Sequence, residues 1–176
     1  MSKSKAISLN KAFTKTVVTK SIVFAVFLAS ATVIPALIHQ QFITGPIVNA
    51  VLFSSAIILG TEAAIMIGLI PSLIALSFGL LSPALAPMVP FIMMSNALLV
   101  IIFSGLKEKN YWMSMVSASI LKFIFLFSTS SVVINLLLKK EIATKVAQMM
   151  SWPQLITALI GGIVAFLVIK TIKKSN

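Results

Sequence analysis

Apolar residues run along this chain in long blocks, separated by short breaks that contain polar residues, glycine or proline. A block of about 20 apolar residues is long enough to cross a bilayer core as a helix. The pattern therefore predicts an all-α membrane protein, one compact bundle of six transmembrane helices. The expected helices are Val17–Ile38, Ile47–Leu59, Glu62–Leu80, Met88–Leu106, Met113–Leu138 and Leu155–Ile172.

The breaks between these blocks contain residues that commonly end helices. Gly60–Glu62 divides an apolar run that is too long for one helix, and a proline-containing turn over residues 82–87 precedes the fourth helix. A short segment over residues 139–149 has apolar residues at helical spacing, and we expect it to lie at the membrane interface. The start of the chain resembles a signal peptide, but apolar residues continue to Ile38, so we expect a retained first helix.

The composition agrees with a membrane protein and excludes an ordinary soluble domain. Of 176 residues, 59% are hydrophobic and 10% are charged, whereas a soluble domain carries about 25% charged residues. The 14 basic residues are all lysines, and the net charge is +11. These lysines flank the apolar blocks instead of forming a face with stacking aromatic residues, so we expect them to set the topology and expect no nucleic-acid partner.

The distribution of the lysines predicts the orientation of the chain. Six helices place both termini on one side, and ten lysines flank that side, against three on the other. Cytoplasmic segments of membrane proteins carry an excess of lysine and arginine. We therefore expect cytoplasmic N and C termini, with a basic segment over residues 1–16, a transmembrane domain over 17–172 and a basic tail over 173–176.

Residues that commonly carry catalysis are scarce in this sequence. Aspartate and cysteine are absent and there is one histidine, so the usual nucleophilic arrangements with Ser-His-Asp or Cys-His cannot form. The three glutamates lie far apart, and neither a metal-ligand spacing nor a phosphate-binding glycine loop occurs. We expect no enzymatic activity, no metal and no cofactor, and we place any ATP hydrolysis in partner subunits.

Lys122 is the most informative single residue, because it lies near the middle of the fifth helix. A lysine there costs about 2.5–3.5 kcal/mol on insertion scales, so we expect it to face the bundle interior or a wet cavity. It would be either a positive group for an anionic or carbonyl-bearing ligand or a structural lysine bonded to neighbouring helices. Asn96 lies at similar depth and Thr129 on roughly the same helix face, so both join it as candidate ligand-binding residues.

A polar cluster follows the first apolar block, at its expected outer end. Solvation of a helix end would explain such residues, and so would a loop over residues 40–46 that folds across an outward-facing pocket. On the second interpretation the cluster binds substrate through His39, Gln40, Gln41, Thr44 and Asn49.

Small residues recur every fourth position in the first block, at Ser21, Ala25 and Ala29. Small residues allow membrane helices to approach closely. Their spacing fits either packing inside the bundle or docking on a partner, and the spacing alone does not distinguish these two interpretations.

The chain resembles the substrate-binding S-components of energy-coupling factor (ECF) vitamin and micronutrient transporters. The segment Ala25–Ala29 is similar to the AxxxA of their first helix. Leu59–Gly68 is similar to their LGPxxGAxxG junction, with Thr61 in place of the proline and Ala63 or Ala64 in place of the middle glycine. The segments 44–50 and 90–96 resemble a branch without a settled substrate that is sometimes labelled hydrogenase-associated.

The resemblance implies a subunit of an ATP-driven importer in a prokaryotic cell membrane. It implies that Ser21, Ala25 and Ala29 dock on a transmembrane coupling subunit that is joined to two ATPase subunits, and that the chain captures a vitamin-like small molecule. From the residues alone, two other functions stay open. One is a self-sufficient secondary transporter or channel with Lys122 on the substrate path, and the other is a structural or assembly protein.

Overall fold

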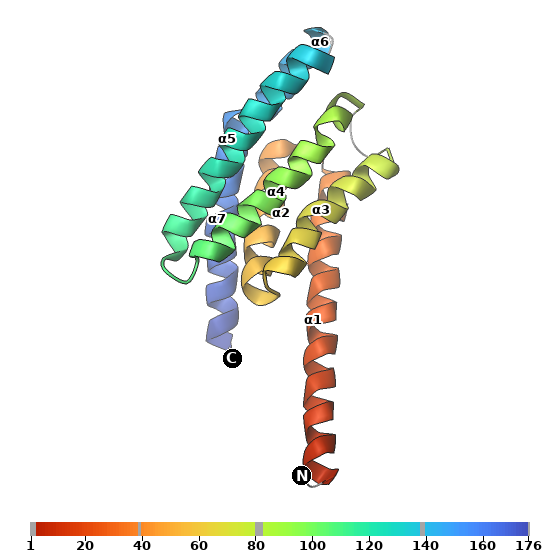
Figure 1. Ribbon diagram of the computed structural model, residues 1–176, viewed down its shortest axis with the longest axis vertical. Helices are drawn as coiled ribbons and strands as arrows, with labels where there is room; N and C mark the ends of the chain where they lie inside the picture. Colours follow the sequence, from red (N-terminus) through yellow and green to blue (C-terminus); the bar gives the residue numbers. More distant parts are fainter. Residues whose placement is uncertain (1–2, 39, 80–82, 138–139, 176) are drawn as a thin grey trace.

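The computed structural model describes residues 3–38, 40–79, 83–137 and 140–175, and the regular elements in these ranges are all helices (Figure 1). They are α1 (Lys3–Leu37), α2 (Gln41–Ile58), α3 (Thr61–Ser77), the 3-10 helix η1 (Pro83–Met88), α4 (Val89–Leu106), α5 (Tyr111–Leu137), α6 (Lys140–Met149) and α7 (Trp152–Ser175). The predicted all-α class is confirmed for this part of the chain.

In the described part of the chain, five segments are long and apolar enough to cross a membrane: Thr16–Leu37, Gln41–Ile58, Ala86–Leu106, Tyr111–Asn135 and Val146–Lys174. The remaining predicted helix, Glu62–Leu80, is present as α3, which is apolar but has only 17 residues. The structure is thus a bundle of six apolar helices and the short α6, and a multi-pass membrane protein is the architecture that it fits.

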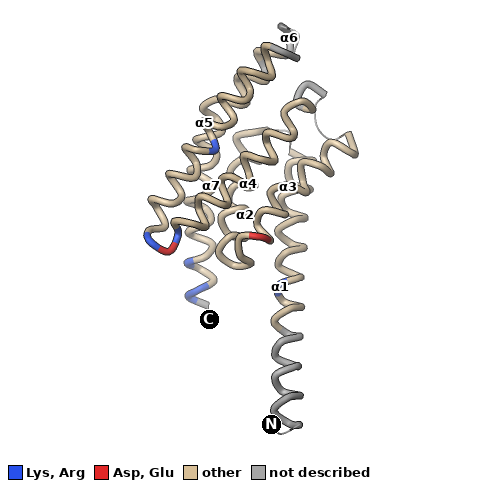
Figure 2. The backbone as a smooth tube through the Cα atoms, viewed as in Figure 1, with Lys and Arg blue, Asp and Glu red and all other residues tan. Residues whose placement is uncertain are grey.

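Both ends of the described chain lie toward the same end of the bundle, called the lower end here because it is at the bottom of Figure 1. The first turns of α1 extend below the other helices, and the connection between α4 and α5 also lies at this end. Figure 2 shows lysine and glutamate gathered there, on that connection and at the end of α7. The shared side of the termini agrees with the predicted topology, while its cytoplasmic location stays a prediction.

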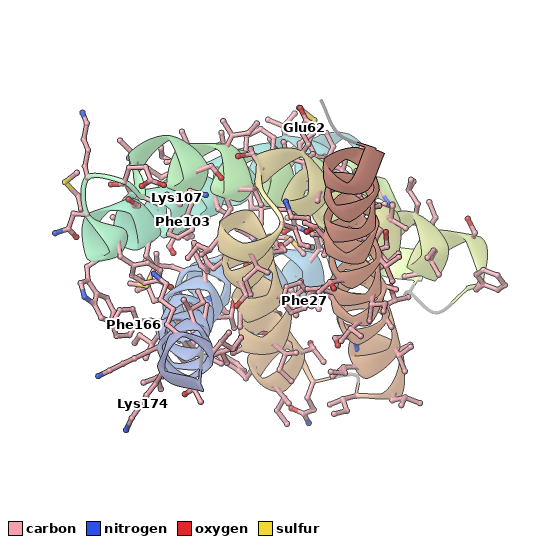
Figure 3. The ribbon with its side chains drawn as sticks, turned by 90° about the horizontal axis from the view of Figure 1, so that it is seen from below. Phe27, Glu62, Phe103, Lys107, Phe166 and Lys174 are labelled. Carbon is pink, nitrogen blue, oxygen red and sulfur yellow. The ribbon has the colours of Figure 1, made fainter. Side chains whose placement is uncertain are left out.

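The lower half of the bundle is filled by a tightly packed core. Its main members have no exposed surface, and we call them the lower core: Leu52, Phe53, Leu99, Phe103 and Ala118. The rings of Phe53 and Phe103 meet edge to face with centroids 4.8 Å apart, an arrangement that aromatic pairs prefer. Figure 3 views the bundle from this end and labels Phe103.

Glycines in the middle of α7 let this helix pack closely against its neighbours. A Cβ on Gly161 would lie 2.6 Å from Cβ of Asn49 and 2.7 Å from the backbone oxygen of Pro46, and a Cβ on Gly162 would collide with Met115. A side chain at Gly161 would press on the backbone of α2, and one at Gly162 would require Met115 to move, and such small residues are typical where membrane helices come together. The contact of α7 with α2 is the most extensive in the bundle.

The prediction of a loop over residues 40–46 is wrong, because α2 begins at Gln41 and includes Gly45 and Pro46. Gly45 and Pro46 favour a break in a helix, since proline removes one helical hydrogen bond. Tertiary packing outweighs that loss. Pro46 is buried, and a Cβ on Gly45 would lie 2.8 Å from the side chain of Thr157 on α7, so this turn of α2 is held by α7.

The segment expected at the membrane interface forms α6, and its apolar face is buried inside the upper end of the bundle. Val146 has no exposed surface, and with Met150 it joins a second core cluster that contains Met88, Leu126 and Val133. The helix therefore covers the upper end of the bundle.

The two faces of α1 differ. Phe24 and Phe27 pack against the core, and Figure 3 shows Phe27 on the side of α1 that faces the bundle. Ser21, Ala25 and Ala29 lie on the other side and are exposed. Packing of this small-residue face inside the chain, one of the two interpretations of its spacing, is therefore not what the structure shows.

Candidate ligand-binding site

A cavity of about 470 Å³ lies in the upper half of the bundle, and each of the seven α-helices in the described chain contributes to its lining. Cavities that hold small molecules in proteins commonly enclose about 300–1,000 Å³. The cavity is mostly apolar, with a few polar side chains from α1, α2, α3, α4, α5 and α7.

The Lys122 side chain lines this cavity and is only 4% exposed. Its Nζ donates hydrogen bonds to Oδ1 of Asn49 and to Oδ1 of Asn96, each at 2.8 Å. Lys122 therefore joins α5 to α2 and α4 at a point about 17 Å along α5 from its first residue, at a rise of about 1.5 Å per residue. Figure 2 shows the lysine colour within α5 away from both ends of the helix.

Each asparagine is held by a second hydrogen bond, so its oxygen is turned toward the lysine. Asn49 Nδ2 donates to the backbone oxygen of Gly45 at 2.9 Å, and Asn96 Nδ2 donates to the backbone oxygen of Gly68 at 3.1 Å. Because the amide nitrogen is occupied on a carbonyl, the amide oxygen is the group left to accept from the ammonium. The three side chains form one network, which we call the Lys122 triad.

Glycines make room for the triad. A Cβ on Gly68 would lie 3.1 Å from Cβ of Asn96, which is tighter than almost all real contacts of this kind. Gly161 likewise has no room for a side chain, because its Cβ would lie 2.6 Å from Cβ of Asn49. The backbones of α3 and α7 therefore approach the two asparagines closely, and this approach fixes where their amides lie.

Two glutamines lie at the upper boundary of the cavity. Nε2 of Gln41 donates to the backbone oxygen of Met149 at 2.7 Å, and Nε2 of Gln154 donates to the same oxygen at 3.1 Å. These bonds tie α2 and α7 to the end of α6. Thr44 also lines the cavity here, and its hydroxyl donates to the backbone oxygen of Gln40 at 3.1 Å.

Two prolines line the cavity from inside helices, Pro35 in α1 and Pro71 in α3. A proline within a helix cannot donate to the carbonyl four residues before it. The carbonyls of Ala31 and Ile67 therefore lack their usual helical donor, and both residues lie in the cavity wall. Each is a backbone acceptor in an otherwise apolar part of the lining.

The structure brings together five of the eight residues expected to bind substrate. Asn96 and Lys122 meet as their similar depth suggested, and the polar cluster after the first helix contributes the remaining three. The five that line the cavity are Gln41, Thr44, Asn49, Asn96 and Lys122. His39 lies outside the described residues.

Two of the residues expected to bind substrate, Gln40 and Thr129, do not line this cavity. Gln40 is exposed and precedes α2, with its backbone oxygen in the first turn of that helix, and it does not line the cavity. Thr129 is on the same face of α5 as Lys122 but two turns further up, and its hydroxyl donates to the backbone oxygen of Phe125 at 2.7 Å. A threonine within a helix commonly bonds back in this way, so shared helical face alone was a weak signal.

Sequence reasoning missed Gln154 and the contributions of α3 and α6. Gln154 follows Trp152 and Pro153 at the start of α7, where a polar residue is easily taken for a solvated helix end. The walls from α3 and α6 are mainly apolar, with Ser72 of α3 as their polar member. Their clearest sequence marker is Gly68, which has no side chain where α3 meets Asn96.

Groups of three or more metal-ligating side chains do not occur among the residues described here. Comparison with known proteins places the chain in no group, since no family model, no curated protein and no solved structure matches it. The arrangement can therefore be interpreted only through its own chemistry. It is a mostly apolar cavity with one buried ammonium group, two amides beside it and further amides at its upper boundary.

Proposed function

We propose that this chain is the substrate-binding subunit of an ATP-driven importer of the ECF type, and that it captures a vitamin-like small molecule in the Lys122 cavity. The observation that carries the proposal is a cavity of small-molecule size around a buried lysine at mid-bundle. A lysine at this depth is costly, and such residues commonly mark substrate sites in membrane proteins.

The position of the cavity supports import. It lies in the half of the bundle away from both termini and from the lysines at the lower end. If the termini are cytoplasmic, as the excess of lysine predicts, the cavity is on the outer side of the membrane, where a substrate arrives. The resemblance of Leu59–Gly68 and Ala25–Ala29 to S-component motifs supports the same function.

The exposed face of α1 supports docking on a coupling subunit. Ser21, Ala25 and Ala29 form an exposed stripe of small residues on α1. Val26 and Val33 on the same side are 55% and 51% exposed. A partner helix could approach this face closely, because small side chains let backbones come near.

Copurification tests the proposal. An affinity-tagged chain extracted from its own membranes in mild detergent is expected to bring a transmembrane coupling subunit and two ATPase subunits. Ala25→Trp is expected to abolish this complex because the indole prevents a partner helix from approaching closely, and to leave the melting temperature of the isolated chain within about 2 °C, since Ala25 is exposed. Ile163→Trp, at an exposed site on α7, is the matched control and should keep the complex.

A chain that purifies without ATPases would contradict the proposal. The second candidate is a self-sufficient secondary transporter or channel, which the position of Lys122 inside the bundle also fits. Uptake of the substrate that persists in a strain without the ATPases would favour this candidate. Uptake that stops in that strain is expected for the importer subunit.

A further inference from the structure

The buried ammonium of Lys122 has no counterion in the described part of the chain. No carboxylate is among the described residues that line the cavity, and Glu62 and Glu108 are exposed elsewhere, on the first turn of α3 and on the connection after α4. The two partners of Nζ are neutral amide oxygens. When Lys122 is protonated, the amides satisfy its hydrogen bonds but leave its positive charge in a site of low dielectric constant, which is costly unless an anion is present.

The triad also has unused hydrogen-bond donors. An ammonium group has three N–H donors, and two of those on Lys122 are used. Each asparagine amide has two N–H donors, and one on Asn49 and one on Asn96 are used on backbone oxygens. Up to three donors at the floor of the cavity therefore have no partner in the described chain. An acceptor with a negative charge would satisfy both the charge and the donors.

The presence of a single cationic side chain among the described lining residues indicates how much negative charge the ligand carries. A phosphate or a dicarboxylate carries about two negative charges and is usually held by several cationic side chains or by the fork of arginine. One lysine and two amides match a single negative charge shared by two oxygens. A cationic ligand would be repelled, because Lys122 is the only charged side chain among the described lining residues.

The walls between the triad and the upper boundary are mainly apolar, and Thr32 and Ser72 add two hydroxyl groups to the lining. The walls consist mainly of Ala31, Pro35, Val48, Ile67, Ile92 and Met149. The amides of Gln41 and Gln154 stand at the far end. Eight residues of α2 separate Gln41 from Asn49, which corresponds to about 12 Å along the helix.

We infer that the ligand of this cavity is a small monocarboxylate, with its carboxylate on Lys122 and the two asparagine amides, an apolar body between α1, α3 and α4, and a neutral polar end toward Gln41 and Gln154. The inference rests on the proposed function of the cavity as a ligand site. It adds to that function the charge, polarity and approximate length of the molecule.

The test compares two probes of the same length that differ at one end group, suberic acid monoamide with a carboxylate and suberamide with a neutral amide in its place. Each has an extended chain of about the required length. The full chain in lipid nanodiscs is titrated with each probe, and binding is followed by thermal stabilisation. The monoamide is expected to bind at least about tenfold more tightly than the diamide, because a hydrogen-bonded ionic contact replaces a neutral one.

Variants assign the preference to the lysine. Lys122→Gln is expected to remove the difference between the two probes, and Lys122→Arg is expected to retain most of it because the charge is kept. Lys107→Gln is the matched control. Lys107 also donates to a backbone oxygen, that of Ala56 at 2.6 Å, but it lies at the lower end, away from the cavity. Its variant should show the wild-type preference. The comparison of probes on the wild-type chain requires no variant to fold.

Equal binding of the two probes by the wild-type chain, or unchanged preference in Lys122→Gln, would overturn the inference. Native mass spectrometry of protein purified from its own membranes separates this failure from failure of the proposed function. A chain that retains a neutral or cationic molecule and binds neither probe would overturn the monocarboxylate and leave the substrate-binding function in place. A chain that retains no small molecule and binds neither probe would overturn both.

Discussion

The upper and lower halves of this bundle are built from the same helices but are packed in opposite ways. The lower half of α2 contributes Leu52 and Phe53 to a core without exposed surface, where aromatic rings interlock. The upper half of the same helix contributes Thr44, Val48 and Asn49 to a cavity of about 470 Å³. One half therefore supplies rigidity and the other leaves space.

The difference shows how a membrane bundle can hold a cavity without collapsing. Lipid does not drive apolar helices together as water does, so association depends on close packing and interhelical hydrogen bonds. The lower core supplies the packing. The bonds from Tyr111 to the backbone oxygen of Gly162 at 2.6 Å and from Lys107 to that of Ala56 close the lower end. With this end fixed, the upper helices can stay apart around Lys122.

The largest expected effect on stability is in the lower core. Phe103→Ala should lower the free energy of unfolding by about 3 kcal/mol, because it removes a fully buried ring in contact with Phe53 and Tyr111. Chemical denaturation in detergent micelles measures this. Phe78→Ala is the control at an aromatic site that is 76% exposed, and its effect should stay below about 0.5 kcal/mol. Equal effects of the two variants would contradict the assignment of the lower core.

A smaller effect is expected where the two halves meet. Gly161→Ala should destabilise the chain by about 2 kcal/mol, since a new Cβ would press on Asn49 and on the backbone of Pro46. Displacement of Asn49 should also weaken ligand binding in a titration. Gly105→Ala is the matched control, because no atom lies within 4 Å of its added Cβ, and it should be neutral or slightly stabilising. A Gly161→Ala chain with wild-type stability and binding would show that α7 does not position the triad.

The smallest expected difference is between alanine substitutions at two valines of α2, one in each half of the bundle. Val51 is buried in the core cluster, whereas Val48 is only partly buried and lines the cavity. Val51→Ala should cost about 2 kcal/mol and Val48→Ala less than about 1 kcal/mol, because fewer atoms pack around the second side chain. Thermal unfolding of both variants in one detergent measures the difference. A reversed order would mean that the cavity wall, and not the core, is the tighter packed region.

Much of the helical pattern was predictable because it depends on local chemistry. Blocks of apolar residues and the breaks between them predicted every helix of the bundle, and α2 and α3 meet at Gly60, which has a backbone φ of +99° that favours glycine. The start of α2 was not predictable in the same way. Gly45 and Pro46 favour a break by themselves, and only their packing against α7 keeps them helical.

The candidate site was predictable in part. The depth of Lys122 and Asn96 along their helices was enough to expect that they meet, since helical rise converts residue number into distance. Asn49 was assigned to the same site, but its bond to Lys122 joins residues 73 positions apart in the sequence. Thr129, in contrast, does not line the cavity. A shared helical face does not show whether a hydroxyl bonds toward a cavity or back to its own helix, and the hydroxyl of Thr129 bonds to its own helix.

By itself, the sequence determined the class of the protein, the approximate positions of its helices and the presence of one costly charge in the middle of a helix. These features follow from hydropathy, helix-breaking residues and the energetics of lysine in a bilayer, which act over a few neighbouring residues. The tertiary structure alone decided that Asn49 joins Lys122 and Asn96 in a cavity, and that Ala25 and Ala29 are exposed. The rotation and close approach of whole helices decide both, and glycines such as Gly68 and Gly161 exert their effect only on residues distant in the sequence.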